Sequence, residues 1–448
     1  MTGVAAIETN RRFILSDISP VCIHIAKGYC NKFNEEEVES YLKMIRDKMS
    51  YLYYSKCEEC EHSFEIDYSI LEENLENQKS INLKTVVGKC ACCNKKIRKM
   101  PDELDLKLHD SHEFEKFYYP KDYFFGNEPK RNYKKGIFQV YQLYSNRNLS
   151  ALSILLSEIE KIGNLEVKQL FLFGFSSILF NCSLMSRYNP KYENTQIKMG
   201  SYYVPKLIKE NNVLLSFERK IKAIIKAKNE IFKENEIYDG SIILQDASQL
   251  DKINSNSIDY IYTDPPYSDK ISYSELNLVY ESWLRNGRTD TSKEMIVSKA
   301  SGKSIEFYSN LFSKFMKECI RVLKPNKKLT IIFHNSSLEH WSYFQEVVNV
   351  DGLRPLISQV PDRLISASKT STQYQTDNDS QCFLAFSFIK DNDYKKKNYS
   401  TLSDKQYSEM ILKIKEEAVQ LGYCSKADIF DFTINRLLFS TKIKNTEN

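Results

Sequence analysis

The chain has 448 residues, 42% of them apolar, so it can build the cores of two or three domains, and global disorder is excluded. Its net charge is only +4, so no overall basic field indicates nucleic acid, and DNA binding would have to use local patches. The sequence shows neither an N-terminal secretion signal nor an apolar run long enough to span a bilayer. We therefore expect a cytoplasmic protein with no membrane partner.

The first thirty residues predict a helix, a strand and a second helix. Residues 4–8 are helical in character, residues 12–16 form a short apolar run that ends at Asp17, and Pro20 suits the first turn of the next helix. In a nucleotide-binding α/β fold, an acidic residue that ends a strand can accept both ribose hydroxyls. Asp17 is therefore a candidate cofactor-binding residue, and a plain helix N-cap is the alternative.

Five of the eleven cysteines fall between positions 57 and 93. Four of them form two CxxC pairs: Cys57 with Cys60, and Cys90 with Cys93. Two such knuckles supply the four sulfur ligands of a closed, structural Zn²⁺ site, and cysteines of a cytosolic chain are thiols or metal ligands. Cys92 could replace Cys93, and His62 is an alternative ligand. The zinc either builds a platform for DNA contact or only folds an insertion too small for its own core.

The middle of the chain combines an irregular segment with helices. Residues 114–147 are rich in Tyr, Phe, Lys, Asn and Pro, which predicts an irregular, surface-building segment. The aromatic and basic residues of 117–135 suit DNA contact, and a merely solvated loop is the equal alternative. Helical spacing marks 149–162, 167–185 and 214–232, and we expect the lysines of the last helix, Lys220, Lys222, Lys226 and Lys228, to form a solvated face.

From Gly240 onward, strands alternate with helices. The pattern predicts a strand over 241–245 that ends at Asp246, a strand over 257–263, a helix over 308–322 and strands over 329–333 and 381–388, the last after a polar stretch over 366–380. Such alternation implies a parallel, doubly wound, Rossmann-like α/β sheet whose ligands lie beyond the carboxyl ends of the strands. Asp246 is thus a second candidate cofactor-binding residue. The tail over 404–438 predicts two helices broken at Gly422, with Ser403 as N-cap.

The sharpest motif is Asp264-Pro265-Pro266-Tyr267, directly after the predicted strand 257–263. To methylate an exocyclic amine, an enzyme must hold a poorly nucleophilic NH₂ with hydrogen-bond acceptors. The Asp264 carboxylate and the carbonyl of the following proline can do this, because consecutive prolines give a rigid loop without N–H donors. An aromatic ring at the fourth position can stack on a base flipped out of the duplex.

Residues 262–276 resemble the catalytic stretch of adenine-specific DNA methylases that carry a Zn-ribbon insertion. The resemblance continues through 283–284, 323–325, 333–335 and Trp341, and residues 16–20 and 25–27 resemble the cofactor side of that family. It implies S-adenosylmethionine as cofactor and adenine N6 in DNA as target, with Asp264 accepting the amine hydrogen bond and Tyr267 stacking on the base. Asp246 would meet the adenine amino group of the cofactor. A restriction-modification or defence-system partner is the expected context.

The chain departs from that family at its beginning. Residues 1–8 resemble only the end of the family's glycine-rich cofactor loop, which leaves Gly3 as a candidate cofactor-binding residue. We expect either a reading frame started too late or a natural truncation. The alternatives to a DNA methyltransferase are a truncated, catalytically impaired nucleic-acid-binding relic, and a methyltransferase acting on RNA or protein.

The expected organisation divides the chain into five regions. Residues 1–50 form the cofactor side of the methyltransferase domain, 51–100 the zinc ribbon, 101–236 an insertion with the target-recognition region, 237–395 the catalytic part, and 396–448 a C-terminal helical extension.

Overall fold

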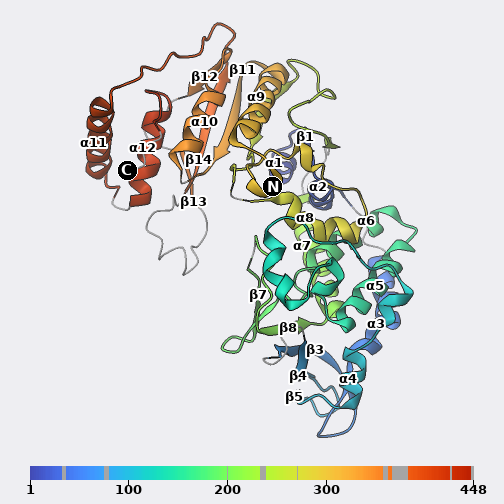
Figure 1. Cartoon of the computed structure of the whole chain (residues 1–448). Coiled ribbons are helices and arrows are strands. Elements are labelled where there is room, and N and C mark those ends of the chain that lie inside the picture. The colour runs from blue at the N-terminus through green and yellow to red at the C-terminus, as the bar shows by residue number, and fades with distance from the viewer. Residues whose placement is uncertain are drawn as a thin grey trace. The chain divides into compact units, whose positions relative to one another are not determined.

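The computed structural model of the chain describes residues 1–32, 37–74, 80–198, 200–232, 239–269, 271–335, 337–356, 362–365, 382–423 and 426–444. Within them the protein is mixed α/β and divides into two compact units (Figure 1). Unit 1 comprises Met1–Leu244 and Tyr273–Ser292, and unit 2 comprises Gln245–Ser272 and Lys293–Asn448.

Unit 1 begins with the predicted helix, strand and helix, which the structure confirms as α1 (Thr2–Glu8), β1 (Phe13–Asp17) and α2 (Pro20–Cys30). Pro20 occupies the first turn of α2, where its missing N–H leaves no intrahelical bond unmade. The predicted strand at 241–245 is β9 (Gly240–Leu244), which pairs in parallel with β1 so that Asp17 lies opposite Leu244.

The cysteine-rich segment belongs to a seven-stranded sheet. Its main order is β5 (Lys96–Lys99), β4 (Ile81–Lys89), β3 (Ser63–Glu73), β8 (Leu207–Asn211), β6 (Arg187–Asn189) and β7 (Asn194–Gln196), and β2 (Tyr54–Lys56) also pairs with β3. All of these pairings are antiparallel. Because β8 lies next to β3, the segment between the two CxxC pairs shares a sheet with residues more than a hundred positions later (Figure 1).

The remaining elements of unit 1 are mainly helical. They are α3 (Val38–Met49), η1 (Ser50–Tyr53), α4 (Glu103–His109), η2 (Glu113–Lys116), η3 (Glu128–Lys135), η4 (Val140–Leu143), α5 (Asn146–Glu160), α6 (Leu165–Ile178), α7 (Val213–Phe232) and α8 (Tyr273–Leu284), with η5 (Thr291–Lys293) at the boundary of the unit. The three predicted helices are confirmed as α5, α6 and α7. However, α6 ends at Ile178, and the chain beyond it turns so that the N–H of Leu184 donates to the carbonyl of Leu143 (2.7 Å).

The segment over 114–147 is irregular, as predicted, but only part of it builds surface. Phe114, Phe124, Val140, Leu143 and Tyr144 are all buried in the core of unit 1. Short 3₁₀ turns have no long apolar period, so the sequence does not reveal which of their side chains face inward.

The expected solvated lysine face of α7 also needs one correction. Lys228 is buried, and its ammonium donates to the backbone oxygen of Asn31 (2.5 Å) just beyond the end of α2. Burial lowers the pKa of Lys228 to about 8. This lysine therefore joins α7 to α2, and a positive charge near a helix C-terminus is favourable.

Unit 2 is built on a five-stranded sheet in which β10 (Ile258–Thr263), β11 (Leu323–Phe333), β14 (Cys382–Lys390) and β12 (Leu353–Leu356) are consecutive, while β13 (Asp362–Ile365) also pairs with β14. The predicted strands at 257–263, 329–333 and 381–388 are thereby confirmed. β10 and β11 are parallel, whereas β14 runs antiparallel to β11. The helices include α9 (Ile305–Val322), which confirms the prediction at 308–322, α10 (Leu338–Val348) and the short η6 (Lys299–Ser301).

The sequence predicts that the expected strands all belong to one Rossmann-like sheet. In the described residues they form two separate sheets, so the single sheet stays a prediction. β1 and β9 make a two-stranded sheet in unit 1, and β10 begins the sheet of unit 2. Among the described strands, none pairs with both β1 and β10. The predicted polar stretch at 366–380 lies outside the described residues.

The C-terminal tail forms the two predicted helices, α11 (Asp404–Gln420) and α12 (Lys426–Leu438). Ser403 caps α11 in a reciprocal capping box with Gln406, and Gly422 has a φ of +89°, which stops the helix. Phe439 and Ile443 belong to the buried core of unit 2. The tail is therefore an integral part of this core. No helix in the described part of the chain combines the length and apolarity needed to cross a membrane.

Candidate functional site

The predicted catalytic motif forms a loop at the carboxyl end of β10. This strand ends at Thr263, and residues 264–267 leave the sheet directly afterwards. The neighbouring strand β11 runs parallel to β10 and continues into His334 and Asn335. Parallel strands with a shared carboxyl edge place their following loops together, which is where open α/β sheets bind ligands.

Within this loop, Asp264 and Tyr267 contact each other. The Tyr267 hydroxyl donates a hydrogen bond to Oδ1 of Asp264. Partial burial raises the pKa of the Asp264 carboxyl, and the bond from Tyr267 opposes that rise. The Tyr267 ring is held edge-on to the rings of Phe333 (centroids 6.0 Å apart) and His334 (6.1 Å). The loop therefore presents a hydrogen-bond acceptor and a fixed aromatic ring side by side.

Three side chains from other elements hold this loop; we call Tyr308, Asn335 and His340 the loop clamp. The buried Tyr308 hydroxyl, from α9, donates to the carbonyl of Pro266 (2.8 Å). The side-chain amide of the buried Asn335 donates to the carbonyl of Tyr267 (3.3 Å). His340 Nδ1, from α10, lies 2.9 Å from the Ser268 hydroxyl oxygen.

The clamp matters because the loop ends in an unfavourable backbone conformation. Ser268 is buried and has a φ of +66°, in the left-handed region that a serine rarely adopts. A conformation of this kind persists only where surrounding contacts enforce it. Sequence reasoning missed Tyr308 and His340, because nothing in the pattern of their helices distinguishes them. Asn335 lies in a segment that the family resemblance covered, but no role was predicted for it.

The candidate cofactor residues lie at strand ends and at a helix start. Asp17 Oδ1 accepts from the backbone N–H of Ser19 (2.8 Å), and burial raises its pKa although this hydrogen bond opposes the rise. Asp246 Oδ1 likewise accepts from the N–H of Ser248 (2.8 Å). Asp17 ends β1 in unit 1, whereas Asp246 follows two residues after Leu244, the last residue of β9, and belongs to unit 2. Each carboxylate orders its own turn.

Gly3 has a packing role that the sequence did not suggest. It lies in the first turn of α1 with an ordinary helical backbone, and an added Cβ would meet Cys30 Sγ at 2.6 Å and Leu15 Cδ1 at 2.9 Å. The missing side chain thus lets α1 approach β1 and α2 closely. The described structure gives Gly3 no cofactor-facing geometry, and its role as a cofactor residue stays a prediction.

The four predicted zinc ligands come together. Cys57 Sγ lies 3.8 Å from Cys93 Sγ, and Cys60 Sγ lies 3.6 Å from Cys90 Sγ. A Zn–S bond of about 2.3 Å in a tetrahedral site places the sulfur atoms about 3.8 Å apart. The thiol arrangement therefore fits a four-coordinate Zn²⁺ ion.

The backbone of the two knuckles repeats the same turn. Each knuckle is followed by a residue with positive φ, Glu61 (62°) after Cys60 and Asn94 (57°) after Cys93. The N–H of Cys57 donates to the carbonyl of His62 (3.0 Å), and the N–H of Cys90 donates to the carbonyl of Lys95 (3.0 Å). Because these turns close the ends of β2–β3 and β4–β5, the sheet itself positions the sulfur atoms.

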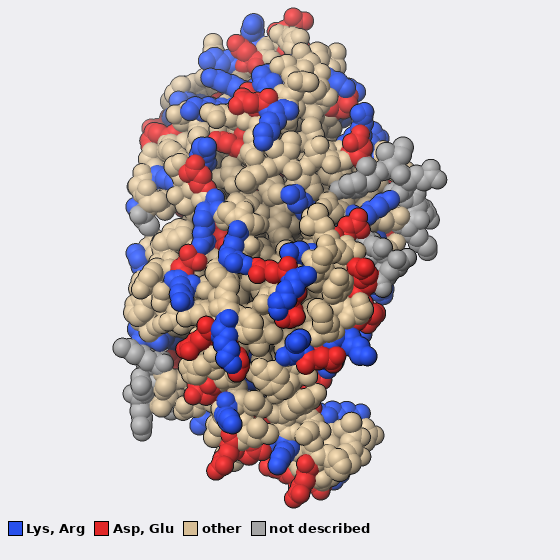
Figure 2. Space-filling view, turned by 90° about the vertical axis from the view of Figure 1, so that its right-hand side faces the viewer, with Lys and Arg blue, Asp and Glu red and all other residues tan. Residues whose placement is uncertain are grey.

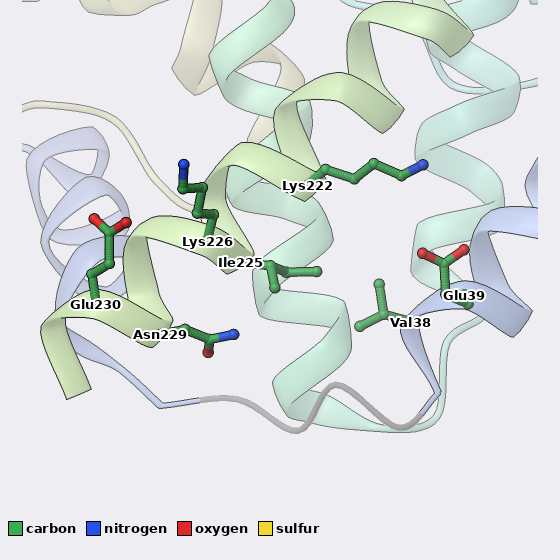
Figure 3. A pocket seen from close by; sticks show the side chains of 7 residues that line it. All are labelled: Val38, Glu39, Lys222, Ile225, Lys226, Asn229 and Glu230. Atoms are coloured by element: carbon green, nitrogen blue, oxygen red, sulfur yellow. The ribbon is translucent and has the colours of Figure 1, made fainter. Parts of the chain in front are cut away.

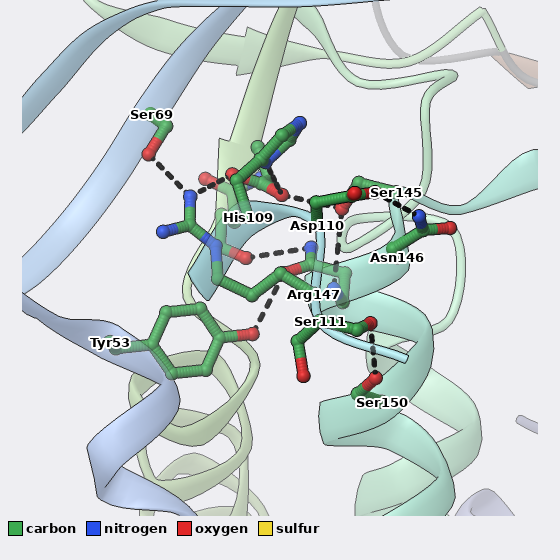
Figure 4. Close-up of polar contacts among 12 residues, drawn as sticks. Tyr53, Ser69, His109, Asp110, Ser111, Ser145, Asn146, Arg147 and Ser150 are labelled. Atoms are coloured by element: carbon green, nitrogen blue, oxygen red, sulfur yellow. Dashed lines mark hydrogen bonds and ion pairs between the residues drawn. The ribbon is translucent and has the colours of Figure 1, made fainter. Parts of the chain in front are cut away.

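A buried ion pair joins this sheet to the helices (Figure 4). Arg147 of α5 donates through Nη2 to Glu210 of β8 and to the Ser69 hydroxyl of β3 (2.7 Å). The Ser145 hydroxyl also donates to Glu210 (2.5 Å), and His109 Nδ1 lies 3.3 Å from the same carboxylate. Burial opposes the ionisation of Glu210, but Arg147 and His109 outweigh it and hold its pKa well below the usual range.

The predicted DNA-contact segment over 117–135 is only partly available for contact. Tyr118 donates to the backbone of Ser282 (2.5 Å), whereas the Tyr123 side chain is 70% exposed and Phe125 is also exposed. Lys121 lies over the ring of Tyr119, 4.7 Å from its centroid. The exposed aromatic and basic side chains fit stacking and phosphate contact.

The charges on the face displayed in Figure 2 are mixed, and unit 1 has one hollow among its described residues that we consider for ligand binding. Over the face that it displays, Figure 2 shows Lys and Arg interspersed with Asp and Glu. A hollow of about 590 Å³ opens between α3 and α7 in unit 1 (Figure 3). None of the residues that line it is a predicted site residue. The lining consists of Val38, Glu39, Lys222, Ile225, Lys226, Asn229 and Glu230.

Comparisons with known proteins identify no family for the chain. No protein-family model matches it, and neither does any curated protein. Two crystal structures of a protein of Thermus thermophilus, provisionally named a DNA modification methylase, align with it at a TM-score of 0.16. The selenomethionine derivative is 12% identical over 38% of this chain and 62% of that chain, and the other is 13% identical over 40% and 64%. The match thus spans less than two thirds of that protein, and so low a TM-score supports no argument.

Proposed function

We propose that this chain is a DNA methyltransferase that transfers a methyl group from S-adenosylmethionine to adenine N6. The observation that carries the proposal is the Asp264–Tyr267 loop, held by the clamp at the carboxyl end of a parallel strand. An acceptor beside an aromatic ring suits a planar base with an exocyclic amine, and the sequence resemblance points to adenine. By the sequence resemblance, Asp17 at the end of β1 would bind the ribose of the cofactor and Asp246 its adenine.

The residues of the loop would act in sequence. In the free protein the Tyr267 hydroxyl donates a hydrogen bond to the Asp264 carboxylate. An entering amine would therefore replace this hydrogen bond with one of its own. The Asp264 carboxylate then accepts one N–H of the amine and aligns the nitrogen, while the Tyr267 ring stacks on the base. When bound, S-adenosylmethionine would supply an activated methyl group and leave as the neutral thioether S-adenosylhomocysteine. The chain itself would orient the amine and exclude water, and the amine proton would pass to water after the transfer. The zinc site would hold the sheet of unit 1 and take no part in the chemistry.

The proposal is tested with Asp264→Ala and a matched control. Alanine removes the acceptor for the amine N–H, so methyl transfer should fall by about a hundredfold or more. The control is Asp259→Ala on the preceding strand β10, whose exposed carboxylate pairs with Lys324 at 2.9 Å. This control should keep its activity. Transfer of tritiated methyl groups onto DNA, RNA and protein is measured for each variant, and undiminished activity of Asp264→Ala would refute the assignment.

Two further outcomes separate the competing functions. Methyl transfer to RNA or protein, but not to DNA, would show that the proposed substrate is wrong and the proposed reaction is right. Absence of both transfer and S-adenosylmethionine binding in calorimetry would instead favour a nucleic-acid-binding relic. A restriction or defence partner remains part of the proposal, and co-purification from the native host tests it.

A further inference from the structure

The zinc knuckles carry a second set of ligand atoms that the four-thiolate site does not use. The ligand atoms of Cys60, His62 and Cys92 lie within 4.8 Å of one another. Cys60 belongs to both sets, whereas His62 and Cys92 are exposed on the outer side of the knuckles. The first knuckle has glutamates between its cysteines, so only the second supplies an additional thiol.

The backbone of the first knuckle orients His62. His62 Nδ1 lies 2.9 Å from the carbonyl oxygen of Cys60, so a proton on Nδ1 is donated to that oxygen. This tautomer leaves the lone pair of Nε2 for a metal ion. Metal-binding histidines commonly use their other ring nitrogen in this way, which fixes the ring and raises its basicity.

Electrostatics favour a second cation at this position. A Zn²⁺ ion with four thiolates carries a net charge of −2, which attracts a further cation. Lys95, the residue after the second knuckle turn, is paired with Glu59 at 2.6 Å, so its charge is already balanced. A divalent ion that shares the Cys60 sulfur would reduce the accumulated negative charge.

We propose that Cys60, His62 and Cys92 form a second, exposed metal position for a thiolate-preferring divalent ion such as Zn²⁺ or Cd²⁺. The Cys60 sulfur bridges the two ions, and binding releases one proton from the Cys92 thiol to the buffer. With three protein ligands, the fourth position is open to solvent, in contrast to the closed four-thiolate site. This position is independent of methyl transfer.

The test is a Cd²⁺ titration of the full chain followed by native mass spectrometry. The unaltered chain should bind two ions, and the double variant His62→Asn/Cys92→Ser should bind one. The control His112→Asn removes another exposed histidine of unit 1 and should still bind two ions. A chelator should remove the second ion well before the first.

Each other result overturns the proposal. A chain that never exceeds one ion has no second position. A double variant that still binds two ions uses other ligands, and a double variant that binds none shows that Cys92 or His62 belongs to the four-ligand site itself.

Discussion

The buried pair between Arg147 and Glu210 provides the sharpest test of how the sheet that carries the four cysteines is held. Both side chains are almost fully buried, with exposed fractions of 0% for Arg147 and 2% for Glu210. The substitution Glu210→Gln keeps the shape of the side chain but removes its charge. It leaves the Arg147 guanidinium buried, with the Ser69 hydroxyl and an amide oxygen as its remaining acceptors.

The expected cost follows from this uncompensated charge. Removing one partner of a buried ion pair destabilises a protein by about 3–5 kcal/mol. Nε and Nη1 of Arg147 already lack a partner among the described residues, so they cannot offset the loss. The glutamine oxygen can still accept one hydrogen bond, which places the expected loss at the lower end, about 3 kcal/mol. This is a large share of the stability of a typical domain, about 5–15 kcal/mol.

Urea unfolding followed by tryptophan fluorescence measures the effect. The chain has two tryptophans, Trp283 buried in unit 1 and Trp341 buried in unit 2. A Trp341→Phe background therefore lets the fluorescence report on unit 1. The matched control is Glu193→Gln, which removes an exposed carboxylate paired with Lys96 and Arg98 and should shift the midpoint far less. Equal shifts for the two variants would refute the reasoning.

The same pair predicts a pH dependence. The folded pKa of Glu210 is depressed, so its contribution is complete above the unfolded pKa of about 4.3 and is lost as the pH falls below that value towards the folded pKa. The stability difference between the unaltered chain and Glu210→Gln should therefore narrow as the pH falls below about 4. A difference that widens below this pH would contradict the assigned sign.

Three further predictions concern the metal, the loop and the tail. Cys90→Ser should lower the zinc content relative to the unaltered chain and lower the melting temperature of unit 1, as metal analysis and calorimetry can show. An unchanged zinc content would contradict the four-thiolate assignment. Tyr308→Phe removes the hydrogen bond to the Pro266 carbonyl and should lower kcat of methyl transfer about tenfold, corresponding to about 1.4 kcal/mol, with little change in the KM for DNA; unchanged kcat would exclude a positioning role. Phe439→Ala should destabilise unit 2 by about 3 kcal/mol, because the ring is buried against Phe386 and Phe388, and a cost below 1 kcal/mol would show that the tail is not part of the core.

Long periodic segments were predictable because their pattern reports directly on burial. The apolar face of 214–232 becomes α7, and the apolar run at 257–263 becomes β10. Helix ends with explicit signals were also predictable, as Ser403 and Gly422 show. The irregularity of residues 114–147 was also predicted, but which of their side chains are buried was not, because the inward-facing residues follow no period.

The candidate site divides in the same way. The DPPY motif and the CxxC pairs are local in sequence and chemically specific, so residue type and spacing alone pointed to Asp264, Tyr267 and the zinc ligands. The loop clamp comes from three separate elements, and its contacts are single hydrogen bonds at positions that no spacing rule marks. The packing role of Gly3 shows a feature that the sequence could not reveal, because the contacts that leave no room for a Cβ come from Leu15 and Cys30.

The sequence by itself determined the residues that could carry chemistry and the periodic elements on which they lie. Only the tertiary structure decided that the two cysteine knuckles close to zinc-bonding distance across one sheet, because antiparallel pairing between β3 and β4 joins residues far apart in the chain. It also decided that the C-terminal tail completes the core of unit 2 and that the Tyr267 hydroxyl donates a hydrogen bond to Asp264 in the free protein. These features depend on side chains that meet through long-range packing, and long-range packing leaves no local pattern in the sequence.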